Sequence, residues 1–418
     1  MRPYDLIVWG VTGFTGKLVA EYLCHHYMGV DAEMPQTGSK RLHWAIAGRS
    51  LEKCQQVLDD LKVSTPFDGE IDILTADALD LESLQILASQ CRVMCTTVGP
   101  YRKYGRLLLQ ACVEQGTHYV DLTGESPFVR ESIDLYHQEA HRQKLKIVHA
   151  CGFDSIPSDL GVFFTQQQML QQKGHYASQI RMMTGKMKGG LSGGTFASMV
   201  DLFEEARNDR AILKLLGNPY ALNPLDAQKG LDRHDQMGVQ WDRWAGKWTC
   251  PFMMAGVNTR VVRRSHALQG FPYGSHFRYS EVMGWPEGLK GLMTSIGITV
   301  GLGGFVGLMA SSKWLRNWIH RRFLPQPGEG PSAQSRQEGY FTIHFYAGDD
   351  KLELACQVSD NIDPGYACTA KMMAESALSL VFQMDDLPQD FGVLTPSVAF
   401  GTVLLERLEA KGMLFSVN

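Results

Sequence analysis

The first 150 residues alternate between short apolar runs and amphipathic stretches with a helical period. The amphipathic stretches predict helices, including Leu51–Leu61, Leu81–Ser89, Gly105–Val113 and Pro127–Gln143. The apolar runs predict strands at Leu6–Trp9, His43–Arg49, Ile71–Asp77, Val93–Val98, His118–Leu122 and Lys146–Ala150. Short strands that alternate with helices are typical of a parallel, doubly wound sheet. We therefore expect residues 1–150 to form an α/β domain of the Rossmann type.

Three glycines at three-residue spacing follow the first apolar run. Residues 4–16 read YDLIVWGVTGFTG, and a helical pattern begins directly afterwards. A strand, a glycine turn and a helix start in this order form the crevice that holds a dinucleotide pyrophosphate. The spacing G-x-x-G-x-x-G is less common than G-x-G-x-x-G, and a glycine-rich turn that binds nothing is the alternative. The order of the elements favours the cofactor site.

Each glycine of this turn has an expected task. Gly10 would let the chain turn tightly, and Gly13 would let the backbone approach the phosphates. Gly16 would let the new helix pack closely on the sheet. We assign the whole turn to the cofactor site: Gly10, Thr12, Gly13, Phe14, Thr15 and Gly16.

The ends of the second and third predicted strands indicate which dinucleotide is bound. An acidic residue after the second strand would bind the ribose 2′-hydroxyl of NAD, whereas an arginine accommodates the 2′-phosphate of NADP. The chain has Arg49 and Ser50 there, with no Asp or Glu between Trp44 and Ser50. We therefore expect NADP(H); a surface arginine at a helix start is the alternative. Asp77 is expected either to touch the adenine side of the cofactor or to be an exposed turn residue.

The fourth predicted strand ends in TTVGPY, where nicotinamide and substrate should meet, because ligands bind outside the carboxyl ends of such strands. Gly99 permits close backbone approach and Pro100 holds the turn rigid, so both are assigned to the cofactor site. Tyr101 is a candidate proton donor to the substrate. The alternative is a turn residue whose ring is half buried.

Three acidic residues follow near the same crevice. Asp121 and Glu125, in YVDLTGE, end the fifth strand, and such an acid either relays protons or caps the following helix. The segment CGFDSIPSDLG at 151–161 has the polar caps and early proline of a helix N-terminus. Its position beside the crevice also suits a substrate-side role for Asp154. The candidate catalytic residues are therefore Tyr101, Asp121 and Asp154.

From residue 151 the pattern is mixed. Tyr340–Tyr346 and Leu352–Val358 alternate apolar and polar residues around a Gly-Asp-Asp turn, which predicts a hairpin with one buried side. Gly365–Gln383 predicts a long helix over that hairpin, and a glycine-led helix is expected at 193–208. We therefore expect an α+β substrate domain over 151–390, with a flexible linker at 325–337.

Composition and charge exclude several classes of protein. The 418 residues carry a formal net charge of −4, which offers no basic surface for nucleic acid. Nine cysteines occur without a C-x-x-C, and the closest pair, Cys91 and Cys95, has no histidine cluster beside it. We therefore expect no disulfide framework, no metal site and a reducing compartment. Because a core strand begins near residue 4, we expect no signal peptide and a cytoplasmic protein.

The motifs together carry a family resemblance. The opening glycine turn, AGRS, TTVGPY, YVDLTGE and CGFDSIPSDLG are followed by VVRR at 261–264 and by LTPSVAF…LLERLEAKG at 394–412. In this order they resemble the saccharopine dehydrogenase-like oxidoreductase family, in the branch with the trans-acting enoyl reductases. The resemblance implies a Rossmann domain, an α+β second domain and a segment 391–418 that returns to the first. It implies cofactor contacts at Gly10, Gly13, Gly16 and Arg49, and it supplies no established catalytic residue.

For the last segment, the resemblance implies a specific docking site. Thr402–Ala410 is predicted to be helical, and Met413–Val417 forms an apolar tail. Both are expected to dock on the Rossmann domain rather than on the second domain.

The expected function is an NADP(H)-dependent oxidoreductase that reduces a C=C or C=O bond of a hydrophobic small-molecule or lipid-linked substrate. A dinucleotide-binding sensor or scaffold without turnover is one alternative, because no obvious Tyr-x-x-x-Lys pair is present. Saccharopine-type amino-acid chemistry is another and needs basic groups for dicarboxylates. Arg260, Arg263 and Arg264 could serve, although a solvated helix face suits them better. The oligomeric state is left open.

An uncharged stretch, Gly291–Ser312, stands between Lys290 and Lys313. Its length is close to the roughly 20 residues of a membrane span, but six glycines and several hydroxyl residues lower its apolarity. One interpretation is a glycine-rich segment buried in the second domain. The other is an exposed patch that touches a membrane surface together with aromatic and basic residues up to 322. We expect peripheral contact of 291–322 with membrane or lipid, without spanning.

Overall fold

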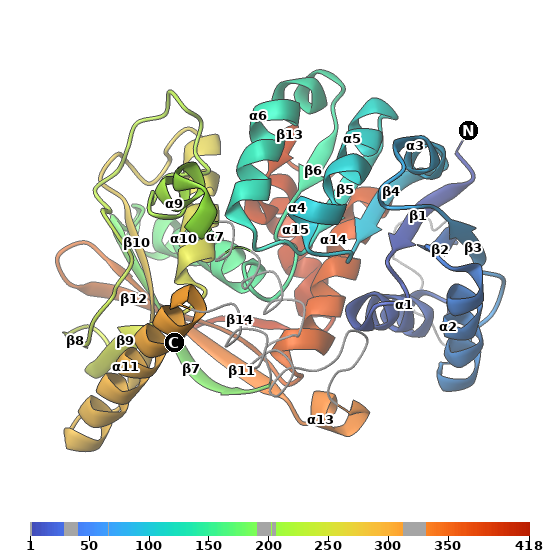
Figure 1. The fold of residues 1–418 in the computed structure, drawn as a ribbon. Coiled ribbons are helices and arrows are strands. Elements are labelled where there is room, and N and C mark those ends of the chain that lie inside the picture. The colour runs from blue at the N-terminus through green and yellow to red at the C-terminus, as the bar shows by residue number, and fades with distance from the viewer. Residues whose placement is uncertain (1, 29–40, 66, 190–201, 203–205, 312–331) are drawn as a thin grey trace.

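The computed structural model describes residues 2–28, 41–65, 67–189, 202, 206–311 and 332–418. These residues form two seven-stranded sheets with helices between and around them (Figure 1). The helix expected at 193–208 and the linker up to residue 331 lie wholly or largely outside the described residues.

The first sheet is parallel and has the strand order β3-β2-β1-β4-β5-β6-β13. Between β1 and β4 the direction of winding reverses, which is where such sheets open a ligand crevice at their carboxyl ends. The expected Rossmann fold is confirmed. Its strands are β1 (Tyr4–Trp9), β2 (Trp44–Gly48), β3 (Asp72–Thr75), β4 (Cys91–Thr96), β5 (His118–Asp121), β6 (Lys146–Val148) and β13 (Gly392–Leu394).

Alternate residues of these buried strands serve two separate cores. Ile7 and Trp9 of β1 belong to one core, and Leu6 and Val8 belong to the other, as the two-residue period of a strand requires. The first core is closed by α3 (Leu81–Ser89), α5 (Arg106–Glu114) and α6 (Ser126–Arg142). The second includes α1 (Phe14–Tyr27), α2 (Leu51–Ser64), α7 (Ile156–Lys173), α14 (Thr369–Phe382) and α15 (Pro396–Ala410).

Helix α14 corrects the expectation for Gly365–Gln383. It packs on α1, β4 and β5 of the first sheet rather than over the hairpin. All of its residues from Thr369 to Val381 are buried, so it needs partners on every side. The Glu375 carboxylate within it accepts hydrogen bonds from the Tyr22 and Tyr27 hydroxyls of α1, each at 2.7 Å.

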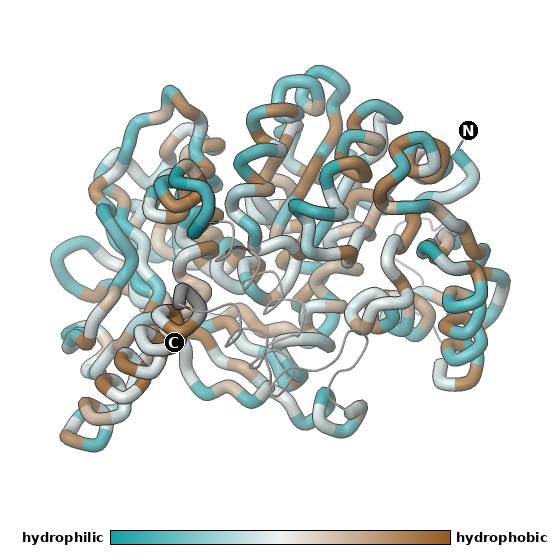
Figure 2. The backbone as a smooth tube through the Cα atoms, in the orientation of Figure 1, coloured by the Kyte–Doolittle hydropathy of each residue, from teal (hydrophilic) through white to brown (hydrophobic). Residues whose placement is uncertain are grey.

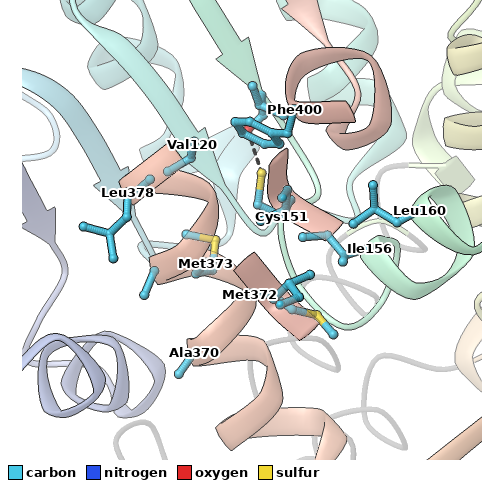
Figure 3. Close-up of a cluster of buried hydrophobic side chains, with 14 of the residues drawn as sticks. Val120, Cys151, Ile156, Leu160, Ala370, Met372, Met373, Leu378 and Phe400 are labelled. Atoms are coloured by element: carbon cyan, nitrogen blue, oxygen red, sulfur yellow. Dashed lines mark hydrogen bonds between the residues drawn. The ribbon is translucent and has the colours of Figure 1, made fainter. Parts of the chain in front are cut away.

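The core between the sheets is built from the helices that join them. Figure 3 shows Met372 and Met373 of α14 near Ile156 of α7, with Phe400 of α15 close to Cys151. Because these side chains belong to one continuous apolar cluster with both sheets, the two halves of the chain share a core.

The second sheet is mixed and has the strand order β14-β12-β11-β7-β10-β9-β8. Its predicted hairpin is confirmed, with Phe341, Ile343 and Phe345 buried on one strand. On the other strand Leu354, Cys356 and Val358 are buried, whereas Leu352, at the turn, is exposed. The strands are β7 (Gln179–Lys188), β8 (Gln240–Asp242), β9 (Lys247–Pro251), β10 (Arg278–Trp285), β11 (Tyr340–Gly348), β12 (Leu352–Asp360) and β14 (Leu414–Val417).

The C-terminal segment divides between the two sheets. Strand β13 pairs with β6 and extends the Rossmann sheet. Helix α15 then packs on α7 and α14 between the sheets. Strand β14 pairs with β12 of the second sheet, so the expectation that the tail docks only on the Rossmann domain is wrong. The edge of β12 offers backbone groups that an extended tail can pair with.

The described part of the second half also contains the short α9 (Arg210–Leu216) and three further helices. They are α10 (Ala255–Leu268), α11 (Leu289–Ser311) and α13 (Ala333–Gln337). Helix α13 corrects the end of the expected flexible linker. Helix α11 runs along β9 (Figure 1), and most of its described side chains are exposed, so the interpretation as a buried segment is wrong.

Candidate active site

The glycine turn has the geometry that its sequence predicts. Gly10 adopts a left-handed conformation with φ of +93°, which favours glycine. A Cβ atom at position 10 would overlap the Val98 side chain, and one at position 16 would overlap the Gly10 carbonyl. The Gly13 N–H donates to the Gly10 carbonyl at 2.9 Å and closes the turn. Gly10 and Gly16 therefore make the tight strand–helix contact, while Gly13 is exposed at its tip.

Helix α1 begins at this turn and presents its N-terminus to the crevice. Gly13 is its N-cap residue, no side chain caps it, and its first turn holds no acidic residue. The first N–H groups of a helix have no acceptor within it, so they are available to an anion. Thr12 and Gly13 are exposed, and Phe14 and Thr15 are half-exposed. The turn fits a dinucleotide pyrophosphate.

The end of β2 fits the adenosine phosphate of NADP. Arg49 is exposed and forms no ion pair with any described residue. Ser50 caps α2 by accepting a hydrogen bond from the Lys53 N–H at 3.3 Å, which fixes the loop next to Arg49. Asp77 is exposed and accepts the Leu79 N–H at 3.0 Å, the arrangement of a turn residue. A direct contact between Asp77 and the adenine side stays a prediction.

Tyr101 lies in the core rather than at the surface of the crevice. It begins the short helix α4 (Tyr101–Tyr104) after a cis Gly99–Pro100 peptide bond. Its hydroxyl donates to the Thr96 carbonyl at 3.2 Å, and its ring stacks on Phe128. Burial raises the pKa of this phenol well above its ordinary value. These contacts suit the packing role, and proton donation by Tyr101 stays a prediction without support from this geometry.

Asp121 is fully buried at the end of β5 and accepts several hydrogen bonds. His149 Nδ1 lies 2.8 Å from Asp121 Oδ2, and the Tyr119 hydroxyl donates to the same oxygen at 2.9 Å. The other oxygen accepts the Thr123 N–H at 3.0 Å. On the far side of the imidazole, the Ser132 hydroxyl lies 2.7 Å from His149 Nε2. Asp121 therefore ties the ends of β5 and β6 together.

Sequence reasoning missed His149. The signal was the neighbouring placement of the two strand ends, VDLTGE and HACG, in a parallel sheet. The prediction that Glu125 caps the following helix is wrong: Glu125 is the N-cap residue of α6, but its side chain makes no capping hydrogen bond there. Its carboxylate accepts the N–H groups of Tyr101 and Arg102 at 2.8 and 2.9 Å.

Asp154 occupies a different environment from Asp121. It follows β6 in the loop that leads to α7, and its side chain is partly exposed. Its carboxylate has no hydrogen-bond partner among the described residues, and burial raises its pKa to about 6. The preceding Phe153 packs on Phe341 of the second sheet, with ring centroids 4.7 Å apart. Of the three candidate catalytic residues, Asp154 is the one that is partly exposed, whereas Tyr101 and Asp121 are buried.

Residues of the second half reach the start of α1. The Tyr366 ring, in the single-turn helix η1 (Pro364–Cys368), packs edge-on against Phe14 at 4.8 Å between centroids. The guanidinium of Arg336 lies over the same Phe14 ring, 5.5 Å from its centroid. Arg336 brings positive charge beside the anion-binding turn. Sequence reasoning missed it because 325–337 was expected to be a flexible linker.

The three arginines of α10 correct another expectation. Arg260, Arg263 and Arg264 are 5%, 4% and 1% exposed, so they do not lie on a solvated face. Arg260 pairs with Asp235, and Arg263 Nε donates to Asp232 at 3.0 Å. Arg264 donates to the Leu222 and Val393 carbonyls. Their donors hold the segment 216–235 and β13 in place.

No cluster of three His, Cys, Asp or Glu side chains suited to a metal occurs among the described residues. The nine cysteines are all buried and unpaired, Cys91 and Cys95 included.

The sequence is similar to known NADP-binding proteins, in agreement with the Rossmann fold and the glycine turn. Residues 6–148 match the saccharopine dehydrogenase NADP-binding domain. A putative trans-acting enoyl reductase of Mycobacterium tuberculosis is 39% identical over 99% of this chain and 97% of its own. The trans-acting enoyl reductase of Mycobacterium ulcerans is 34% identical over 100% and 98%.

Among solved structures, the likeness extends to the fold alone. Apo saccharopine dehydrogenase (L-Glu forming) from Saccharomyces cerevisiae superposes with a TM-score of 0.52 at 10% identity, covering 99% of this chain and 100% of that chain. Because the mycobacterial relatives exceed 30% identity over nearly the whole length, the chain belongs to the saccharopine dehydrogenase-like oxidoreductase family, in the branch of the trans-acting enoyl reductases, and is an NADP-dependent oxidoreductase.

Proposed function

We propose that this oxidoreductase reduces a C=C bond in a hydrophobic, lipid-linked acyl substrate. Reduction of a C=O bond in the same kind of substrate is the alternative. The names of its relatives support an enoyl substrate. The observation that carries the proposal is the placement of Asp154, a partly exposed acid with a pKa of about 6, beside the carboxyl edge of a sheet whose first turn fits NADP. Bound NADPH would supply the hydride.

The chain's own residues divide the remaining work. The turn Gly10–Gly16 and the N-terminus of α1 would hold the pyrophosphate, and Arg49 would hold the 2′-phosphate. Reduction of a double bond also requires a proton. A carboxyl group with a pKa near 6 retains its proton over part of the physiological range and donates it more readily than a buried phenol. We assign proton donation to Asp154 rather than to Tyr101.

Asp121 is given a positioning role. It is wholly buried and fully occupied by its hydrogen bonds, so it does not face a ligand. Its second oxygen accepts the Ala150 N–H at 3.3 Å. Ala150 has a positive φ of 61°, which is uncommon for a residue other than glycine. Through this bond and His149, Asp121 holds the start of the loop that carries Asp154.

The alternative of saccharopine-type chemistry needs cationic groups for a dicarboxylate. Arg260 and Arg263 are buried and paired with Asp235 and Asp232, and Arg264 donates to backbone carbonyls. Breaking such buried pairs to bind a substrate would cost about 3–5 kcal/mol each. These arginines therefore favour a less polar substrate.

The test is NADPH oxidation with a panel of acyl thioesters that differ in one feature at a time. Pairs of 2-enoyl and 3-ketoacyl thioesters distinguish C=C from C=O reduction, and short and long chains distinguish a small from a lipid-like substrate. We expect turnover with long 2-enoyl thioesters and its loss in Asp154→Asn, with NADPH affinity retained. Tight NADPH binding without turnover of any thioester would favour the sensor, and turnover of a glutamate-derived imine would favour the amino-acid reaction.

A further inference from the structure

Helix α11 presents an apolar stripe away from the body of the protein. Gly291 and Ser295 are buried on its inner side, where it packs on β9. Its outer side repeats at helical spacing and carries four large apolar side chains. Leu289, Met293, Ile296 and Val300 are 73%, 58%, 38% and 69% exposed. Figure 2 shows the helix white and brown over most of its length.

The polar groups of α11 are satisfied within the helix. The Thr294 hydroxyl donates to the Lys290 carbonyl at 2.9 Å, and the Thr299 hydroxyl donates to the Ser295 carbonyl at 2.8 Å. Hydroxyl side chains are accommodated in hydrocarbon by donating in this way to a backbone carbonyl of the preceding turn. From 291 to 308 the helix has no ionisable side chain. A protein partner would ordinarily find about one hydrogen bond per 100–200 Å², and this stripe offers it none.

Near its start, α11 is surrounded by an exposed tryptophan and by basic side chains, which suit the headgroup layer of a membrane. Trp241 is 41% exposed and packs edge-on against Trp248 of β9, with centroids 5.2 Å apart. Exposed Lys290 lies at the start of α11, and exposed Arg243 and half-exposed Lys247 lie on the β8–β9 hairpin, whose strand β9 packs on α11. Glu287, in the turn before α11, is an exposed acid near these cations in sequence. Tryptophan and lysine or arginine are the residues that flank membrane-buried segments.

The length of α11 is also compatible with contact to a membrane. Leu289–Leu308 is long and apolar enough to cross a membrane by composition alone, although its start is anchored to the second sheet through β10. Gly297, Gly301, Gly303, Gly304 and Gly307 have open space where a Cβ atom would be, so no described part of this chain covers that end. A core helix of this composition would be buried.

We propose that α11 embeds its outer stripe in the surface of a phospholipid bilayer and thereby holds the enzyme on the membrane. The apolar stripe enters the acyl region, and the cations and Trp241 at its start contact the headgroups. This inference stands on exposure and charge and does not depend on the identity of the substrate.

The experiment uses the full chain, vesicles of phosphatidylcholine with or without phosphatidylglycerol, and two matched pairs of variants. Val300 on α11 and Val63 on α2 are both exposed helical valines, at 69% and 84%. Because all nine native cysteines are buried, Val300→Cys and Val63→Cys each offer one accessible thiol for an environment-sensitive fluorophore. Val300→Glu and Val63→Glu serve for vesicle flotation.

We expect a vesicle-dependent blue shift at position 300 and none at position 63. Val300→Glu should lower the partition coefficient by about tenfold or more, whereas Val63→Glu should leave it unchanged. Phosphatidylglycerol should strengthen binding and salt should weaken that gain. NADPH affinity, unchanged in all four variants, checks the fold.

Three results would overturn the proposal. The first is equal fluorescence at both positions with vesicles. The second is flotation that Val300→Glu does not reduce. The third is a stable dimer without lipid that Val300→Glu dissociates, which would show that a second copy covers the glycine-rich stripe.

Discussion

The space that a methyl group at position 16 would need is occupied by the carbonyl oxygen of Gly10. This contact places the first turn of α1 directly on the end of β1. It also leaves Gly13, between them, at an exposed turn tip whose own Cβ atom would meet only the Gly10 carbonyl, at 3.3 Å. The two glycines therefore serve different purposes, one for folding and one for ligand approach.

Gly16→Ala and Gly13→Ala should separate these purposes. Gly16→Ala forces the strand and helix apart and should lower the free energy of unfolding by about 1–3 kcal/mol. Gly13→Ala should change stability much less but should weaken NADPH binding, because the methyl group stands where the phosphates approach. Urea unfolding and NADPH titration measure the two effects. Equal loss of stability in both variants would contradict this division.

Arg49→Ala should lower the affinity for NADPH more than that for NADH. Removing a guanidinium that contacts a phosphate removes a charge-assisted hydrogen bond worth about 1.5–3 kcal/mol, or roughly 10- to 100-fold in the dissociation constant. NADH lacks the 2′-phosphate and should bind the variant as it binds the natural chain. Exposed Arg41, elsewhere on the same domain, gives a matched control. Parallel losses for both nucleotides would show that Arg49 does not read the 2′-phosphate.

Local patterns account for what could be predicted of the site. The glycine turn, the Arg49 position and the strand ends depend on residues close in sequence, and a parallel sheet aligns those ends automatically. Arg336 and His149 depend on chain segments that meet only in the fold, and no local pattern marks them. The fold itself was predictable where strands and helices alternate, up to residue 150.

The errors in the second half share one physical cause. A pattern records how apolar a segment is but not what covers it. The arginines of α10 look like a solvated face, yet Arg260 pairs with Asp235, 25 residues earlier, and Arg263 pairs with Asp232, 31 residues earlier. A buried segment was one of the two interpretations of the glycine-rich α11, yet no described segment covers its outer stripe. The tail β14 pairs with the open edge of β12, although α14, β13 and α15 lie between the two strands in sequence.

Glu281 should make the protein less stable as the pH rises. Its carboxyl is buried in β10, where it accepts hydrogen bonds from Tyr279 and Asn258, and burial raises its pKa from 4.5 to about 7. The folded chain then holds more protons than the unfolded chain between these values, so this contribution is present below pH 4.5 and is lost as the pH passes 7. The loss is about 3 kcal/mol.

Glu281→Gln should remove that dependence. The amide keeps the shape and cannot ionise, so its free energy of unfolding should fall less between pH 5 and pH 8 than that of the natural chain. Asp159 adds a similar dependence, since its pKa is also raised to about 6, and this part should remain in the variant. Urea unfolding at the two pH values gives the difference. Identical slopes for the two chains would mean that Glu281 is ionised throughout.

Asp154→Asn should lower the rate of double-bond reduction by about 10²–10⁴-fold while leaving NADPH affinity unchanged, because the amide does not donate a proton to the product. In the natural chain the donor must be protonated, and burial sets the pKa of Asp154 at about 6. The turnover number should therefore fall as the pH rises above 6, and the residual activity of Asp154→Asn should lose this dependence.

Tyr101→Phe is the matched test of the competing donor. Its hydroxyl donates to the Thr96 carbonyl inside the core, so we expect a loss of about 1 kcal/mol in stability and a turnover number within a few-fold of the natural value. If Tyr101→Phe abolishes turnover in a folded, NADPH-binding protein while Asp154→Asn keeps both rate and pH profile, the proton comes from the phenol and the assignment to Asp154 is wrong.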